Sequence, residues 1–200
     1  MTIETDATRD TALSILIESG MQWERKGSGQ RFVVHIKQSL STVRALVKTA
    51  SRGSAMVKTD IDDAEKANIS GFKDDVTHVL FAVGDPLSNE VTAFLVPIRE
   101  VEDAYRSTHK VWKSHHPTGE ENTTWVIWFN DRGNADCNGF HLKWAHYRIG
   151  SRNLIIKPEN ESKAFGNQKH ANGLTIAQAK QGLALSLGID PSCIKITIES

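Results

Sequence analysis

Short runs of apolar residues, separated by polar turns, occupy residues 31–96 and predict a β-rich core. Most of these runs are rich in branched residues or alternate apolar with polar positions, as half-buried strands do. The run Val76–Val83 is nearly continuous, which is typical of a central strand buried on both faces. The predicted strands are Arg31–Lys37, Thr42–Thr49, Ala55–Thr59, Val76–Val83 and Glu90–Val96, with the first two forming a hairpin.

Apolar positions at helical spacing lie on both sides of this region. They predict one helix over Ala7–Ser19, with Gly20 at its C-terminal cap, and a second over Pro97–His115. The pattern is weaker afterwards: Thr123–Asn130 is a strand candidate, and aromatic residues are spread through Asn138–Ile149. The predicted class is therefore α/β (α+β), with a mixed central β-sheet flanked by helices.

The C-terminal residues form a separate unit in the sequence. Thr175 and Gln178 fit a capping box that opens an amphipathic helix, and Ile194–Ile198 alternates like a half-buried strand. We therefore expect an α/β domain at 1–150, a polar linker at 151–173 and a helix–strand unit at 174–200. One helix and one strand cannot bury their own apolar face. The unit is expected to complete the core of its own chain, or to dock on a protein partner or on a second copy as a homodimer.

Composition places the chain among ordinary globular proteins. Hydrophobic residues make up 39% and charged residues 24% of the 200 residues, and 24 basic residues balance 24 acidic ones. No apolar run approaches the ~20 residues that a membrane span needs, so no membrane association is expected. The polar N-terminus does not resemble a leader peptide. Two distant cysteines, Cys137 and Cys193, exclude a disulfide framework and suit a reducing, cytoplasmic location.

Charge is unevenly distributed along the chain. Residues 26–59 contain seven cations and no Asp or Glu, and residues 60–75 then contain a run of acids. Such runs form either two solvated faces or a phosphate-facing patch carried on two strands, and both readings stay open here. The cations proposed to contact nucleic acid are Arg31, Lys37, Arg44, Lys48 and Arg52.

Three runs of sequence carry a family resemblance: VRALVKTASRGS, then DDVTHVLFAVGDPLSNEVTAFLVPIREV, then STHKVWKSHH. These runs resemble a group of small bacterial proteins. The shared pattern is a strand ending in Val-Lys-Thr, a Gly-containing turn, a buried strand, and a strand leading into a helix that begins with proline. That group belongs to the PD-(D/E)XK nuclease-like superfamily, and the resemblance spans roughly residues 8–115. It implies a restriction endonuclease-like core and a role in bacterial DNA processing or defence against foreign DNA.

The resemblance also implies where chemistry should lie. In the superfamily an acid precedes the lysine of the motif by two residues, a second acid lies on the preceding strand, and the two hold a divalent cation. Lys48 matches the lysine, but Leu46 stands at the acid position. The preceding strand offers Arg31, His35 and Lys37 as its polar members. The expected protein is a catalytically degenerate nuclease-like scaffold that binds nucleic acid, such as DNA, or a protein partner, without a cofactor; a protein with no nucleic-acid role is a further reading.

An active Mg²⁺-dependent DNA endonuclease is the alternative. It would use Lys48 with acids from outside the motif strands, drawn from Glu18, Glu24, Asp60 and Asp62.

Two further groups of residues suggest weaker sites. The group His109, His115 and His116 is a conceivable zinc site, although its spacing matches no motif and a solvated helix end is the simpler reading. Tryptophans could stack on bases. Trp112 is expected in the core, whereas Trp125 and Trp128 should face opposite sides of one strand.

Overall fold

The computed structural model describes residues 5–26, 32–37, 41–73, 75–85, 87–117, 121–131, 137–155 and 195. The chain divides into two compact units, residues 1–156 and 157–200. Apart from Lys195, the predicted helix and strand of the C-terminal unit lie outside the described residues, so that unit and its docking role stay predictions. Strand β8 ends at Asn153 and so takes in the first three residues, 151–153, of the segment expected to be a linker.

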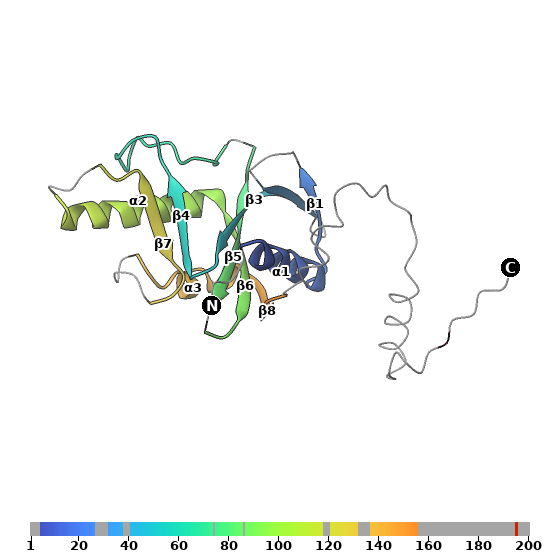
Figure 1. Ribbon diagram of the computed structural model, residues 1–200. Coiled ribbons are helices and arrows are strands. Elements are labelled where there is room, and N and C mark those ends of the chain that lie inside the picture. Colours follow the sequence, from blue (N-terminus) through green and yellow to red (C-terminus); the bar gives the residue numbers. More distant parts are fainter. Residues whose placement is uncertain are drawn as a thin grey trace. The chain divides into compact units, whose positions relative to one another are not determined.

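A six-stranded mixed sheet forms the centre of the first unit (Figure 1). Its strand order is β1-β2-β3-β5-β6-β8, and every neighbouring pair is antiparallel except β3 and β5, which are parallel. The nearly continuous apolar run is β5, which lies inside the sheet, as its composition predicts. The strands are β1 (Gln22–Lys26), β2 (Val33–Lys37), β3 (Thr42–Ala50), β5 (His78–Asp85), β6 (Glu90–Pro97) and β8 (Arg148–Asn153).

Helix α1 (Thr5–Glu18) covers one face of this sheet. Leu13 and Leu16 are buried against side chains that alternate along the strands, including Val47 and Leu80. Ile17 also fits the helical spacing of apolar residues in the sequence, but it is 62% exposed and does not belong to this buried face. Gly20 has a φ of +77°, the left-handed conformation of a helix C-terminal cap.

The opposite face is covered by a two-stranded sheet and the longest helix (Figure 1). Strands β4 (Ser54–Lys58) and β7 (Thr124–Trp128) pair antiparallel, and α2 (Ile98–His115) packs with them on the main sheet. Phe81 of β5, Tyr105 of α2 and Trp125 of β7 are all essentially inaccessible to solvent. The short helix α3 (Phe140–Lys143) and the 3₁₀ turn η1 (Ala145–Tyr147) complete this layer.

Several predicted elements are confirmed, with informative differences. The α/β class, the mixed sheet and the β2–β3 hairpin match the sequence analysis. The strand predicted at Ala55–Thr59 exists as β4, but it leaves the main sheet and pairs with β7. Pro97 is the N-cap of α2 and not its first helical residue. Trp112 was expected in the core, but its ring is half-exposed and stacks between His109 and His116.

Candidate functional site

A groove opens where β3 extends beyond its partner β2. Strand β2 pairs with residues 42–46 of β3, and the last contact on that side is the Val47 N–H donating to Phe32 O at 2.8 Å. The chain then turns through Ser51–Gly53, where Gly53 has a φ of +78°, and returns as β4 outside the sheet. The groove lies at this turn and has a volume of about 910 Å³.

Lys48 lies in this groove on the face of the sheet opposite α1. It is in register with Phe81 of β5, a residue of the core on that face, and its side chain is half-buried. Its ammonium donates to the backbone carbonyl of Met56 at 3.4 Å. Burial lowers the pKa of Lys48 from its usual value. A partly desolvated ammonium gains more from a bound anion than one in open water does.

Two more cations line the groove, and both are exposed. Arg52 comes from the β3–β4 turn, and Lys73 comes from the loop that leads into β5. Sequence reasoning missed Lys73, because it lies among the acids of residues 60–75 and not in the basic segment. Among the described residues that line the groove, none is Asp or Glu. Hydroxyl groups supply the other polar side chains of its lining: Thr5, Thr49, Ser51, Ser54 and Ser70.

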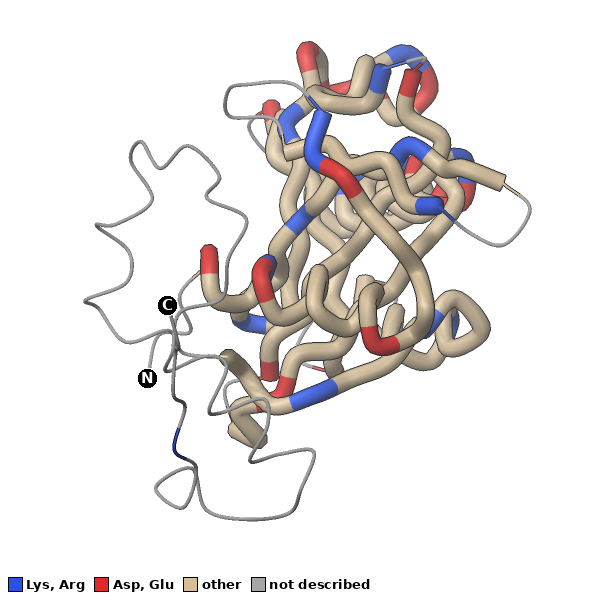
Figure 2. Tube along the Cα trace, turned by 90° about the vertical axis from the view of Figure 1, so that its right-hand side faces the viewer, with Lys and Arg blue, Asp and Glu red and all other residues tan. Residues whose placement is uncertain are grey.

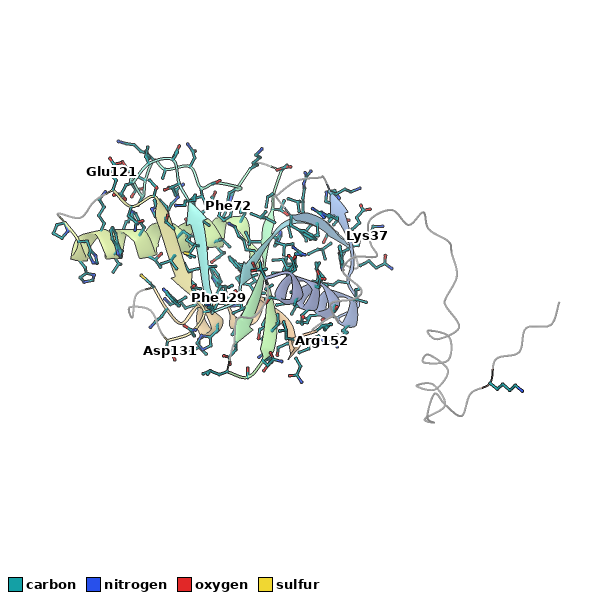
Figure 3. All side chains as sticks on the ribbon, viewed as in Figure 1. Lys37, Phe72, Glu121, Phe129, Asp131 and Arg152 are labelled. Carbon is teal, nitrogen blue, oxygen red and sulfur yellow. The ribbon has the colours of Figure 1, made fainter. Side chains whose placement is uncertain are left out.

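The remaining predicted cations are elsewhere. Arg31 lies outside the described residues. Arg44 precedes Lys48 on the same face of β3, but its guanidinium pairs with Asp75 at 2.6 Å. Lys37 is exposed at the end of β2, paired in register with Gln22 of the edge strand β1 (Figure 3). Of the five predicted contacts, the groove therefore brings together Lys48 and Arg52.

Lys and Arg positions are interspersed with Asp and Glu along the described part of the chain (Figure 2). The basic character of the groove is therefore local.

The acids proposed for a relocated metal site have partners of their own. Glu18 pairs with Arg152, and Glu24 pairs with Lys26 at 2.9 Å and lies 3.8 Å from His35. The hydrogen bond and charge of Lys26 lower the pKa of Glu24. Asp60 accepts bonds from the backbone and side chain of Asn68 at 2.8 and 2.7 Å. In the part of the chain that the structure describes, no three His, Cys, Asp or Glu residues are grouped to hold a metal ion.

Leu46 takes the position of the missing motif acid and is a core residue. It is 4% exposed and packs with Val33 and Val76. The position at which the sequence resemblance expects a metal ligand is therefore apolar.

Asp62 lies apart from the groove and makes the most buried contact between a carboxylate and a basic side chain among the described residues. Its carboxylate is 2.5 Å from His109 Nε2 and 3.1 Å from Lys113 Nζ. Burial by itself would raise the pKa of Asp62, but hydrogen bonds from Lys113, the Asn122 backbone and His109 lower it overall. His109 also stacks on Trp125, with ring centroids 4.4 Å apart. These contacts indicate that His109 has a structural role in packing α2 against β7.

The contact of Asp62 with His109 fastens the loop between β4 and β5 to α2, and this loop forms one wall of the groove. Arg106 of α2 donates to the carbonyls of Ala64 and Ala67 at 2.5 and 3.0 Å, which fastens the same loop to α2. Farther along, the Ser70 N–H donates to Lys58 O of β4 at 2.7 Å. Ser70 and Lys73 then line the groove. Helix α2 therefore positions one wall of the groove through this loop.

Comparisons with known proteins found no matching protein-family model, no matching curated protein and no matching solved structure. Among the described residues, no helix is both long enough and apolar enough to cross a membrane.

Proposed function

We propose that this protein is a nuclease-like scaffold that binds nucleic acid through the groove at Lys48 and has lost metal-dependent cleavage. The observation that carries the proposal is the composition of the groove. Lys48, Arg52 and Lys73 line it, and no described lining residue is a carboxylate. A role in bacterial DNA processing or defence remains part of this proposal and rests on the sequence resemblance.

Phosphate is the anion that this lining suits best. Ammonium and guanidinium groups form charge-assisted hydrogen bonds with phosphate oxygens, and serine and threonine hydroxyls commonly add further contacts to them. Ser51 and Ser54 lie in the same turn region as Arg52, so a phosphate beside that residue has neutral donors close by. A volume of about 910 Å³ exceeds what a single phosphate needs, which favours a larger phosphate-bearing ligand.

The donor set argues against metal-dependent hydrolysis at Lys48. A hard divalent cation needs several oxygen ligands, usually with carboxylates among them. The motif position holds buried Leu46, and Glu18 and Glu24 are engaged in ion pairs away from the groove lining. Three cations in the groove would also repel a metal ion.

Binding is tested with fluorescently labelled DNA and RNA oligonucleotides by anisotropy over a series of salt concentrations. Three phosphate contacts predict that log K for a single strand falls with log salt at a slope of about −2. Lys48→Met, Arg52→Gln and Lys73→Gln should each weaken single-strand binding and reduce this slope by roughly one contact. Lys37→Gln is the matched control, because it removes one exposed cation outside the groove.

Two results would count against this function. Equal loss of affinity from Lys37→Gln and from the three groove variants would show that binding is not localised in the groove. Cleavage of DNA in the presence of Mg²⁺ or Mn²⁺, abolished by Lys48→Ala, would show that the metal-dependent reaction persists.

A further inference from the structure

The three cations of the groove are not equally accessible. Arg52 and Lys73 are exposed, whereas Lys48 is half-buried and bonded to the Met56 carbonyl. The same burial lowers the pKa of Lys48. A ligand must therefore enter the groove to contact Lys48, but it can contact Arg52 and Lys73 from outside.

The size of the groove separates the two forms of nucleic acid. Its volume of about 910 Å³ lies within the range of small-ligand pockets, roughly 300–1,000 Å³. A duplex is far larger, since its major groove alone is about 12 Å wide. A duplex can lie across the rim and contact exposed cations. A single strand has separately rotating phosphates and unpaired bases, so a segment of it can enter.

The exposed apolar side chain of Met56 suits an unpaired base. Met56 is 60% exposed beside Lys48, and a thioether chain packs well on flat rings. Phe32 also lines the groove, but it packs with the core on the α1 side of the sheet, and the guanidinium groups of Arg9 and Arg25 already lie 4.6 and 4.5 Å from its ring centroid. Met56 is therefore the apolar contact that we assign to a base beside Lys48. In a duplex the bases are already stacked on each other and would gain little from this rim.

We infer that the groove selects single-stranded over duplex nucleic acid, with a phosphate of the strand reaching the recessed Lys48 and a base packing on Met56. This inference rests on the proposed function and makes Lys48 the residue that determines strand preference. Arg52 and Lys73 then supply attraction that both forms of nucleic acid share.

The test measures affinities of the full chain for a labelled oligothymidine and for a hairpin duplex of equal charge, at one salt concentration. We expect the single strand to bind about tenfold more tightly or better. Lys48→Met should remove most of this preference by weakening single-strand binding and leaving duplex binding within about twofold. Arg52→Gln and Lys73→Gln should weaken both ligands by similar factors and keep the preference.

Met56→Ser provides a second and independent readout. It removes the apolar surface without changing charge, so it should lower single-strand affinity while the salt dependence stays the same. Circular dichroism spectra confirm that each variant is folded.

The possible results distinguish a failure of the strand preference from a failure of nucleic-acid binding itself. Equal affinity for both ligands, or a preference that survives in Lys48→Met, would overturn the strand preference while leaving nucleic-acid binding in place. Failure of both ligands to bind at low salt would overturn the proposed function, and the inference with it.

Discussion

Replacing Asp62 with Asn removes the carboxylate charge from the buried Asp62–His109 contact. The His109 and Asp62 side chains are 1% and 8% exposed, and their atoms are 2.5 Å apart. Disrupting a buried pair by changing one partner typically costs about 3–5 kcal/mol. Asparagine keeps one acceptor oxygen and nearly the same volume, so we expect a smaller loss of about 2–3 kcal/mol in the free energy of unfolding. Lys113 is 51% exposed and adds little to this figure.

The loss is measured by urea unfolding followed by tryptophan fluorescence. All five tryptophans lie between residues 23 and 144, and Trp112 and Trp125 stack on His109, so the signal reports this unit. A loss of about 2–3 kcal/mol corresponds to a fall in Tm of about 4–12 °C. The matched control is Lys110→Gln, which breaks the exposed pair with Glu65 and should change stability by less than about 0.5 kcal/mol.

A double-mutant cycle of Asp62→Asn with His109→Gln isolates the pair itself, with an expected coupling of about 1–3 kcal/mol. The pH dependence gives a second check. The folded pKa of Asp62 lies below its usual value of 3.8, so the unfolded chain binds this proton more readily. The carboxylate therefore stabilises the fold above pH 3.8, and this stabilisation is lost as pH falls through the folded pKa. In Asp62→Asn the free energy of unfolding should depend less on pH in this acid range. A coupling energy near zero, or an unchanged pH dependence of the free energy of unfolding in the acid range, would contradict the stabilising role of this pair.

Three other substitutions test contacts elsewhere in the first unit. Tyr105→Phe removes a buried hydroxyl that donates to Ala55 O at 3.2 Å. Burial raises the pKa of this hydroxyl, so it stays protonated and keeps donating. The free energy of unfolding should therefore fall by about 1 kcal/mol. Gly53→Ala adds a Cβ at a φ of +78° that would lie 2.2 Å from Asn130 Nδ2, so thermal melting should show a loss of about 1–2 kcal/mol. Arg152→Gln breaks the exposed pair with Glu18 and should cost less than about 1 kcal/mol; a larger loss in urea unfolding would contradict this.

The sequence predicted strands best where both faces are apolar. Val76–Val83 was predicted from composition alone, because a strand inside a covered sheet has no polar face to confuse the pattern. Strand β1, QWERK, was missed for the opposite reason. It is an edge strand whose side chains are mostly exposed, so its polar sequence resembles a loop. The departure of β4 from the main sheet depends on its pairing with β7, about 70 residues away, which local periodicity cannot reveal.

Only two of the three cations in the candidate site, Lys48 and Arg52, were predictable from the sequence. Lys48 and Arg52 belong to a segment without acids, and the structure places both in one groove. Lys73 joins them because the loop after β4 returns past Ser70, a tertiary contact that no local pattern records. Asp75 returns in the same way and neutralises Arg44. A charge count along the sequence therefore identified the region, whereas the fold decided which cations face the groove.

Lysine footprinting measures whether nucleic acid contacts the groove at Lys48. The full chain is treated with an amine-reactive reagent with and without a single-stranded oligonucleotide, and modification at each lysine is measured by mass spectrometry. The account predicts that the oligonucleotide protects Lys48 and Lys73, while exposed Lys37 and Lys66 react as before. Protection at Lys37 with unchanged reactivity at Lys48 would contradict it.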